Sequence, residues 1–329
     1  MNEFRALRVE QDADGQIGAH IRHLKPDQLP AGEVLIRVSH SSVNYKDALA
    51  ATGTGRIMHK LPMTGGIDLA GIVLESDNPT VIPGSAVLVT GQGLGERHDG
   101  GYAELARVPA DWALPLPANL DAHAVMALGT AGFTAGLSLL RMEQMGQTPE
   151  HGPIAVTGAT GGVGSASIAL FAAAGYEVHA ITGKTDEGPR LRELGAQEIL
   201  LRSEIDFGRR PLESAIWGGA VDSAGGELLT WLTRTTKPWG NIAACGLVGG
   251  TDLHTTVMPF ILRGVNLLGI ATPDCPRTLR EQVWARLAAC FDDRRLALIT
   301  AGDVTLDQLP TVFRQLIDGQ ARGRYVVVL

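Results

Sequence analysis

The sequence predicts an α/β protein of two domains, a β-rich domain at the amino-terminal end followed by a doubly wound domain built on a parallel sheet. Three observations lead to this prediction. The chain has 329 residues, about twice the usual size of one domain. Hydrophobic residues make up 45% of it and charged residues 19%, which is enough apolar material for large packed cores. Near residue 120, short apolar runs broken by glycine and proline give way to Ala- and Leu-rich stretches that alternate with brief β-branched runs.

Short apolar runs separated by turn residues indicate strands in the first part of the chain. Clusters such as Leu29-Pro30-Ala31-Gly32 and Asn78-Pro79 are typical of turns, because proline and glycine favour the backbone angles that turns require. Between such clusters we expect four strands, at residues 34–38, 71–74, 86–89 and 102–108.

From residue 123 onward, helical periodicity alternates with short apolar runs. The pattern predicts a helix at 123–141, a buried strand at 154–157, and an Ala-rich helix at 163–174 that stops at Gly175. Five further strands are predicted at residues 178–182, 198–201, 221–223, 241–245 and 266–270. Strands that alternate with helices are typical of a parallel sheet covered on both faces, and six strands suit a doubly wound domain.

The carboxyl-terminal part combines both patterns. After Pro276 we expect helices near 280–291 and 306–318, and a last strand at 324–329 that returns to the amino-terminal β domain. The first domain is therefore expected to cover residues 1–122 and to be completed by 300–329. The doubly wound domain is expected at 123–299.

Charge and the first residues argue against several classes of protein. Lys and Arg total 28 and Asp and Glu total 35, so the net charge is −7. This is the wrong sign for a protein whose affinity comes from neutralising nucleic-acid phosphates or anionic lipid. The segment MNEFRALRVEQDADG lacks the apolar region of a secretion signal, and no apolar run of 18 residues is evident. We therefore expect a cytoplasmic protein that binds neither nucleic acid nor membrane.

Cysteines and histidines do not predict a metal site. Cys245, Cys275 and Cys290 are too dispersed for a disulfide framework or a structural zinc site, and we expect buried, inert thiols. No His-x-x-x-His helix pair offers zinc ligands, and His98 beside Asp99 is expected at the surface. Because no Gly-x-Ser-x-Gly elbow follows a strand, a serine hydrolase is disfavoured. Of the reaction classes considered, hydride transfer remains.

The strongest chemical signal is a strand that runs into a glycine turn and then a helix, Ile154-Ala155-Val156-Thr157-Gly158-Ala159-Thr160-Gly161-Gly162-Val163-Gly164. In such a turn Gly158 permits the tight bend, Gly161 lets the backbone approach a pyrophosphate, and Gly164 allows close packing of helix on strand. The free N–H groups that open the helix favour an anion. The motif predicts dinucleotide binding; a glycine turn without a ligand is the alternative.

The end of the second strand of this predicted sheet bears on the choice of dinucleotide. An NAD-binding protein usually places an acid here against the ribose 2′-hydroxyl, but the segment reads Ala180-Ile181-Thr182-Gly183-Lys184. Lys184 offers a cation, Thr182 offers a hydroxyl, and Arg202 closes the third strand nearby, so a 2′-phosphate would meet donors. The sequence therefore favours NADPH over NADH. The alternative is that Lys184 and Arg202 are only solvated loop charges.

With these features the chain resembles the medium-chain dehydrogenase/reductase superfamily, in particular its zinc-free quinone oxidoreductase branch and, within it, the acryloyl-CoA reductase group. The resemblance runs essentially end to end. Besides the glycine turn, it rests on the blocks Ser42-Val43-Asn44-Tyr45-Lys46-Asp47, Pro62-Met63-Thr64-Gly65-Gly66-Ile67-Asp68-Leu69-Ala70-Gly71, Gly129-Thr130-Ala131-Gly132-Phe133-Thr134-Ala135, Ala244-Cys245-Gly246-Leu247 and Thr255-Thr256-Val257-Met258-Pro259-Phe260-Ile261-Leu262-Arg263. Zinc-dependent relatives carry Gly-His-Glu where this chain reads Gly66-Ile67-Asp68, so the resemblance also implies independence from metal.

The resemblance implies a GroES-like amino-terminal domain and a Rossmann domain, with cofactor and substrate in the cleft between them. The residues that it assigns to NADPH form three groups: Thr160, Gly161, Gly162 and Val163 at the pyrophosphate; Thr182, Gly183, Lys184 and Arg202 around the 2′-phosphate; and Tyr45, Leu247, Ile261 and Thr272 at the nicotinamide end. Two departures stand out. Lys184 replaces an expected arginine, so the preference for NADPH is expected to be softer than in relatives. An expected Asn-Asn pair is missing before Gly323-Arg324.

The activity that the resemblance implies is hydride transfer from NADPH to the β-carbon of acryloyl-CoA, which gives propionyl-CoA. Negative charge then develops on the carbonyl oxygen, and Asn44 and Tyr45 are the candidate catalytic residues by resemblance. Tyr45 either donates a proton or only packs against the cofactor, and Asn44 either donates or shapes its loop. Reduction of quinones or small enones, and cofactor binding without catalysis, remain alternative functions.

The sequence also predicts a homodimer. The strand at 266–270 would be the last in the Rossmann order and would leave an unpaired edge. A second copy can cover that edge by pairing the same strand with itself, an assembly that the resemblance supports.

Overall fold

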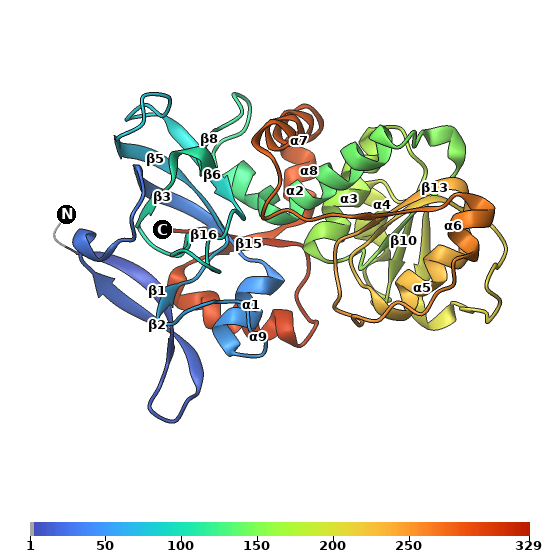
Figure 1. Cartoon of the computed structure of the whole chain (residues 1–329), viewed down its shortest axis with the longest axis horizontal. Helices are drawn as coiled ribbons and strands as arrows, with labels where there is room; N and C mark the ends of the chain where they lie inside the picture. Colours follow the sequence, from blue (N-terminus) through green and yellow to red (C-terminus); the bar gives the residue numbers. More distant parts are fainter. Residues whose placement is uncertain (1–2) are drawn as a thin grey trace. The chain divides into compact units, whose positions relative to one another are not determined.

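The structure is a computed structural model that describes residues 3–329, whose contacts group them into two units (Figure 1). Unit 1 contains the described residues up to Thr130, with Thr272–Glu281 and Thr300–Leu329; unit 2 contains Ala131–Ala271 and Gln282–Ile299. The predicted bounds assign 123–130 and 272–281 to the second domain, whereas contacts group them with unit 1. The reason is hydrogen bonding, because Thr130 binds Asp68 and Arg280 binds Thr90, both in unit 1.

Unit 1 is built on two sheets. The smaller has the order β2-β1-β4, and the larger has the order β15-β16-β3-β5-β6-β8 with β7 beside β3. Neighbours in the larger sheet are antiparallel except β15 and β16. The strands are β1 (Phe4–Gln11), β2 (Ile17–Leu24), β3 (Val34–Ser42), β4 (Met63–Thr64), β5 (Asp68–Ser76), β6 (Ala86–Thr90), β7 (Leu105–Val108), β8 (Leu114–Pro115), β15 (Thr300–Val304) and β16 (Arg324–Val328).

The four strands predicted for this part are present as β3, β5, β6 and β7, with shifted ends. The returning last strand is confirmed as well, since β16 pairs with β3 and places Val327 beside Ser41. β1, β2 and β15 were not predicted. Their sequences mix apolar with polar residues, and β2 has only partly buried or exposed positions, so no continuous apolar run marks it.

Two helices of unit 1 pack against each other beside the sheets. They are α1 (Tyr45–Thr52) and α9 (Leu309–Ile317), and Ala48 of α1 shares an apolar cluster with Val312 and Phe313 of α9. α9 covers most of the helix predicted at 306–318. α1 was not predicted, and it matters because it begins directly after Asn44, its N-cap.

Unit 2 contains the six-stranded parallel sheet, which confirms the doubly wound prediction. Its order is β11-β10-β9-β12-β13-β14, so the direction of winding reverses between β9 and β12. The strands are β9 (Ile154–Thr157), β10 (Val178–Thr182), β11 (Glu198–Leu201), β12 (Trp217–Asp222), β13 (Thr236–Ala244) and β14 (Asn266–Gly269). The first three match the predicted residues, whereas β12 and β13 begin several residues earlier.

The remaining helices are α2 (Ala122–Gln144), α3 (Gly162–Ala173), α4 (Gly188–Leu194), α5 (Gly226–Thr235), α6 (Met258–Arg263), α7 (Arg277–Cys290) and α8 (Asp293–Ile299). An apolar core of unit 2 forms where Leu228 and Leu232 of α5 meet Trp217, Ala220 and Ile242 of the sheet. Residues 164–171 of α3 are buried, which agrees with its Ala-rich sequence, since small side chains let a helix approach the sheet closely.

The helix α2 corrects one expectation from the sequence. By length and composition it is apolar enough to cross a membrane, with an 18-residue window of mean hydropathy 1.4, so the statement that no such stretch occurs is wrong for it. In the structure 83% of that window is buried inside the protein, as in a core helix. The helix is also interrupted at Gly129, whose backbone angles are not helical.

Candidate active site

Three strands of unit 2 end side by side at the edge that carries the glycine turn. In the parallel register Ile181 of β10 lies beside Thr157 of β9, and Thr182 lies beside Leu201 of β11. The glycine turn, the Gly183-Lys184 segment and Arg202 therefore begin at one edge of the sheet. This is the edge at which doubly wound domains bind dinucleotides.

The glycine turn lies directly against the start of α3. A Cβ on Gly164 would come within 2.3 Å of the Gly158 carbonyl oxygen and 2.7 Å of the Ala159 Cα, so only glycine permits this approach. Gly161 is the N-cap of α3, and its N–H donates to the Gly158 carbonyl at 2.9 Å. The N–H groups of the first turn of a helix have no acceptors within it, which suits a phosphate. Thr160, Gly162 and Val163 lie at this turn, as expected.

The end of β10 presents the donors that the sequence predicts. Thr182 is buried and its hydroxyl accepts a hydrogen bond from the Lys184 N–H at 3.0 Å, which fixes the path of the chain through Gly183. Arg202 is exposed and follows β11 on the neighbouring strand end. Two cations and a hydroxyl at one sheet edge fit a 2′-phosphate chemically. The donor set of unit 2 therefore fits NADPH.

A buried carboxylate, Asp222, shapes the same edge. It ends β12, and it accepts hydrogen bonds from the Thr157 hydroxyl at 2.6 Å and from the Gly225 N–H at 2.8 Å. Burial raises the pKa of this carboxyl, while the Thr157 bond opposes the rise. Asp222 thus ties the end of β9 to the start of α5, and sequence reasoning did not single it out.

The predicted nicotinamide residues are divided between the two units. Leu247 follows β13 in unit 2 and is 58% exposed, whereas Thr272 belongs to unit 1. Ile261 is 71% exposed on α6, whose Arg263 binds the carbonyl of Thr236 at the start of β13. Ile261 therefore lies away from the strand ends that carry the glycine turn.

In unit 1 the first candidate residues surround the buried carboxylate of Asp68. Its Oδ2 accepts hydrogen bonds from the Ser42 hydroxyl at 2.5 Å, the Asn44 side-chain amide at 2.9 Å and the Thr130 N–H at 2.8 Å. Its Oδ1 accepts the Thr130 hydroxyl at 2.5 Å. These donors come from three separate parts of the sequence, so Asp68 joins β3, the start of α1 and the interruption in α2.

The two candidate catalytic residues differ in what their side chains already bind. The Asn44 amide donates to Ser42, Asp47 and Asp68, and its carbonyl oxygen accepts from Arg324 at 3.2 Å. Tyr45 is half-buried at the first position of α1, and within residues 3–329 no hydrogen bond is found for its hydroxyl. Asn44 is therefore held within the cluster, whereas the hydroxyl of Tyr45 stays available to a ligand.

Asp47 adds a second buried carboxyl to this cluster. It accepts from the Asn44 N–H at 2.9 Å and from the Ile67 N–H at 3.0 Å. Burial raises its pKa from 3.8 to about 7, and the nearby charge of Asp68 adds to the rise. Tyr102, also buried, donates to the Ser42 carbonyl at 3.0 Å, and burial raises the pKa of its phenol well above the ordinary value.

Arg324 is the buried cation of this cluster, which we call the Asp68 cluster: Ser42, Asn44, Asp47, Asp68, Thr130 and Arg324. Its guanidinium donates to the carbonyls of Ala127 and Val43 at 3.0 and 2.8 Å. Burial lowers its pKa, and the charges of Asp68 and Asp47 oppose that change. Its Nη2 is buried without a hydrogen-bond partner in the described chain.

The raised pKa of Asp47 predicts a pH dependence of stability. Between about pH 4 and pH 7 the folded protein holds a proton on Asp47 that the unfolded chain has lost, so the free energy of unfolding should fall as pH rises through this range. The steepest slope from this group is about 1.4 kcal/mol per pH unit. Urea unfolding from pH 4 to pH 8 should show the slope in the wild type and a flatter profile in Asp47→Asn. The same change at the exposed Asp27 should leave the slope intact; an unchanged slope in Asp47→Asn would refute the assignment.

The acidic and cationic members of the Asp68 cluster were not selected from the sequence. From the sequence, Asp68 was noted only as the residue that replaces a zinc ligand, and Arg324 only in the Gly323-Arg324 pair and as the start of the last strand. The available signal was an acid at the start of the apolar run Ile67-Asp68-Leu69-Ala70. A carboxylate in a buried strand requires several hydrogen-bond donors around it, so an acid in such a run predicts a cluster of buried polar residues.

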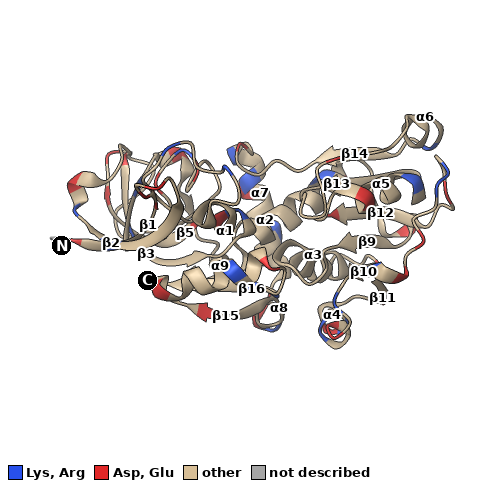
Figure 2. Cartoon of the chain, turned by 90° about the horizontal axis from the view of Figure 1, so that it is seen from below, with Lys and Arg blue, Asp and Glu red and all other residues tan. Residues whose placement is uncertain are grey.

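No metal site is found among residues 3–329. No three His, Cys, Asp or Glu side chains gather there in a way that could hold a metal ion. Figure 2 shows acidic and basic residues interspersed along each unit. Of the three cysteines, Cys275 is buried, while Cys245 and Cys290 are partly exposed, so the expectation of burial is met in full only for Cys275.

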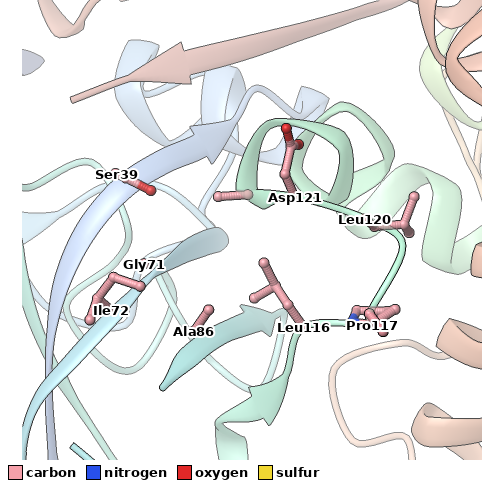
Figure 3. A pocket seen from close by; sticks show the side chains of 10 residues that line it. Ser39, Gly71, Ile72, Ala86, Leu116, Pro117, Leu120 and Asp121 are labelled. Atoms are coloured by element: carbon pink, nitrogen blue, oxygen red, sulfur yellow. The ribbon is translucent and has the colours of Figure 1, made fainter. Parts of the chain in front are cut away.

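A hollow of about 410 Å³ lies in unit 1 (Figure 3), and no member of the Asp68 cluster lines it. Its walls include Ile72, Leu116, Pro117 and Leu120, and its polar side chains are those of Ser39 and Asp121. Asp121 already accepts the Ala124 N–H at 2.7 Å at the start of α2. None of the predicted site residues lines this hollow, so it is not the candidate active site.

The fold and the dinucleotide edge define an oxidoreductase of the dehydrogenase type, and comparisons with known proteins identify the family. Residues 30–118 match the alcohol dehydrogenase GroES-like domain, and residues 162–289 match the zinc-binding dehydrogenase family. The chain belongs to the medium-chain dehydrogenase/reductase superfamily, with a GroES-like unit and a Rossmann-like unit, as the resemblance implied.

Three relatives cover nearly the whole chain. The acrylyl-CoA reductase AcuI of Ruegeria pomeroyi is 45% identical, and the alignment covers 98% of each chain. The yhdH oxidoreductase of Salmonella enterica, solved in complex with NADP, is 44% identical, with a TM-score of 0.96 and 99% coverage of both chains. The Bacillus subtilis protein yhfP, solved with NAD bound, is 40% identical, with a TM-score of 0.96 and full coverage of both; it bears the name "Putative quinone oxidoreductase YhfP".

Proposed function

We propose that this chain reduces the activated C=C bond of acryloyl-CoA to propionyl-CoA with NADPH and without metal. The observation that carries the proposal is its 45% identity, over 98% of both chains, with the acrylyl-CoA reductase of Ruegeria pomeroyi. The structure supports it with a sheet edge that fits NADPH in unit 2 and a cluster of buried polar residues at the start of α1 in unit 1. Reduction of quinones is the second candidate, favoured by the name of the Bacillus subtilis relative.

In the proposal, three groups of residues hold NADPH. The pyrophosphate lies on the glycine turn, at Thr160, Gly161, Gly162 and Val163. The 2′-phosphate lies near Thr182, Gly183, Lys184 and Arg202, and the nicotinamide end lies near Tyr45, Leu247, Ile261 and Thr272.

The candidate catalytic residues take different roles. When bound, NADPH supplies the hydride that adds to the β-carbon of the substrate. The thioester oxygen then gains negative charge, and a nearby donor stabilises it. The free hydroxyl of Tyr45 is available for this, whereas the amide of Asn44 already binds Asp68 and Arg324. We therefore assign Asn44 to positioning the start of α1 and Tyr45 to the donor role, with water as the source of the α-carbon proton.

NADPH oxidation measured under the same conditions with acryloyl-CoA, crotonyl-CoA and 1,4-benzoquinone tests this proposal. We expect the highest kcat/KM for acryloyl-CoA, and at least about tenfold less for crotonyl-CoA, because one extra carbon must fit a small pocket. Dialysis against a chelator should leave these values unchanged. If kcat/KM for benzoquinone equals or exceeds that for acryloyl-CoA, the protein is a quinone reductase. If the protein binds NADPH but turns over none of the three substrates, it is a cofactor-binding protein without catalysis.

The preference for NADPH is expected to depend on Lys184. One charge-assisted hydrogen bond to a phosphate contributes about 1.5–3 kcal/mol to binding. Lys184→Ala should therefore raise the dissociation constant of NADPH about tenfold to over a hundredfold. NADH, which lacks the 2′-phosphate, should bind about equally to both proteins. Titrations of the two cofactors against wild type and variant provide the measurement. Equal wild-type affinity for NADPH and NADH would contradict the assignment.

A homodimer formed through β14 is part of the proposal. β14 lies at the edge of the sheet of unit 2, and Trp239, Val257, Ile261 and Leu262 of the same unit are each more than 60% exposed. A second copy would cover the apolar groups and pair the open edge. Light scattering at micromolar concentration should give the mass of two chains. A single-chain mass would refute the assembly.

Cytoplasmic location, without nucleic-acid or membrane partners, completes the proposal. The net charge of −7 and the metabolic relatives support it. Recovery of the protein with membranes in a cell fractionation would contradict this location.

A further inference from the structure

Arg280 is a buried cation whose position links two parts of unit 1 that are distant in sequence. It lies in α7 and is 1% exposed. One guanidinium nitrogen, Nη1, donates to the Thr90 carbonyl at 2.7 Å and to the Thr90 hydroxyl at 3.2 Å. The other, Nη2, donates to the carbonyls of Thr272 and Pro273 at 2.7 and 3.3 Å. The planar fork therefore bridges the end of β6 and the segment Thr272-Pro273.

Both ends of this bridge have a defined place. Thr90 is the direct partner of Asp68 in the register of β6 and β5, and the next residue, Gly91, donates its N–H to the Ile67 carbonyl at 2.8 Å. Thr272 is the first residue at which the chain enters unit 1 after leaving unit 2 at Ala271. Burial lowers the pKa of Arg280, and the negative charge of Asp68 acts against this change. Asp68 thus lies within electrostatic range of Arg280.

We propose that Arg280 is a positioning residue for the reaction: it fixes the backbone of Thr272 and Pro273 against Thr90, beside the Asp68 cluster. This inference rests on the proposed function, in which Thr272 lies at the nicotinamide end. If the carbonyl groups that accept from the Arg280 guanidinium moved away, the buried positive charge would lose its hydrogen bonds, which costs free energy. The segment that carries Thr272 is therefore fixed before any ligand binds.

The test compares Arg280→Met and Arg280→Lys with a matched control, Arg277→Met. Arg277 lies one turn earlier in α7 and also binds two carbonyls, those of Asp111 and Ala113, but it is exposed. Arg280→Met should lower kcat/KM for acryloyl-CoA by about tenfold to a hundredfold, since displacement of a positioning segment by an ångström has this effect. Arg280→Lys should recover part of the loss, and Arg277→Met should stay within about twofold of wild type.

A second measurement needs no cofactor or substrate. Hydrogen exchange of the free protein should be at least about tenfold faster at residues 272–275 in Arg280→Met than in wild type, and unchanged there in Arg277→Met. Unchanged exchange at 272–275 in a folded Arg280→Met would overturn the proposal. Faster exchange with a wild-type kcat/KM would also overturn it, because the bridge would then be only structural.

If Arg280→Met does not fold, Pro273→Gly replaces it in the test. This change makes the backbone of the same segment more flexible, and it keeps the charge of Arg280 and the carbonyl groups of residues 272 and 273. Its kcat/KM should fall in the same range, and a wild-type value would overturn the proposal. Absence of turnover in the wild-type protein would instead refute the proposed function. The exchange measurement would still decide whether Arg280 fixes the segment.

Discussion

Gly129→Ala should lose at least about 3 kcal/mol of unfolding free energy and at least about a hundredfold in turnover. Gly129 interrupts α2 with φ of 51° and ψ of −155°, a conformation open only to glycine. A Cβ there would lie 2.6 Å from Arg324 Nη2 and from Ser42 Oγ, and 2.7 Å from Asp68 Oδ2. The new methyl group must therefore displace three members of the Asp68 cluster, and with them the start of α1 that bears Tyr45.

A glycine just after the same helix provides a control for backbone strain alone. Gly146, just beyond α2, also has a positive φ, but a Cβ there would meet no atom within 4 Å. Gly146→Ala should therefore cost only about 1 kcal/mol and leave turnover unchanged. Urea unfolding and steady-state rates of both variants measure the difference. Similar values for the two would show that the Asp68 cluster does not depend on close packing at Gly129.

Gly164→Ala is expected to weaken NADPH binding at least about a hundredfold. The methyl group would lie 2.3 Å from the Gly158 carbonyl oxygen and 2.8 Å from its carbon. Because these are backbone atoms of the turn itself, α3 must move away from β9, and the N–H groups at its start no longer face the pyrophosphate together. Titration of NADPH against the variant, followed by cofactor fluorescence, provides the measurement.

The control for this change lies at the other end of α3. Gly175 has a positive φ, and a Cβ there would meet nothing within 4 Å. Gly175→Ala should lower stability by about 1 kcal/mol and leave the dissociation constant of NADPH unchanged. An intact affinity in Gly164→Ala would mean that the cofactor does not use the start of α3.

The sequence predicts unit 2 well because its elements are local and strongly patterned. β9, β10 and β11 are short and mostly apolar, and Gly158 and Gly183 directly follow the first two of them. Their order in the sheet follows from the doubly wound pattern. The residues Thr160, Lys184 and Arg202 could be selected together because each follows a strand end, and parallel strand ends meet at one edge.

The Asp68 cluster could not be assembled in this way. Asp68, Thr130 and Arg324 lie in a strand, a helix interruption and the last strand, and only tertiary pairing brings them together. Gly129 alone did not predict the interruption, since the residues on both sides of it have helical periodicity. Arg280 was not predicted for a related reason. Its guanidinium binds backbone carbonyls, which every residue has, so no particular side chain in the sequence indicates that this arginine is buried.

The position of the transferred hydride tests the central claim most directly. Acryloyl-CoA is incubated with the wild-type protein and NADPH in which both C4 hydrogens of the nicotinamide are deuterium, and the product is analysed by NMR. The account predicts propionyl-CoA with a single deuterium on C3 and none on C2, since the hydride adds to the β-carbon and water protonates the α-carbon. Deuterium on C2, unlabelled propionyl-CoA, or no propionyl-CoA at all would contradict it.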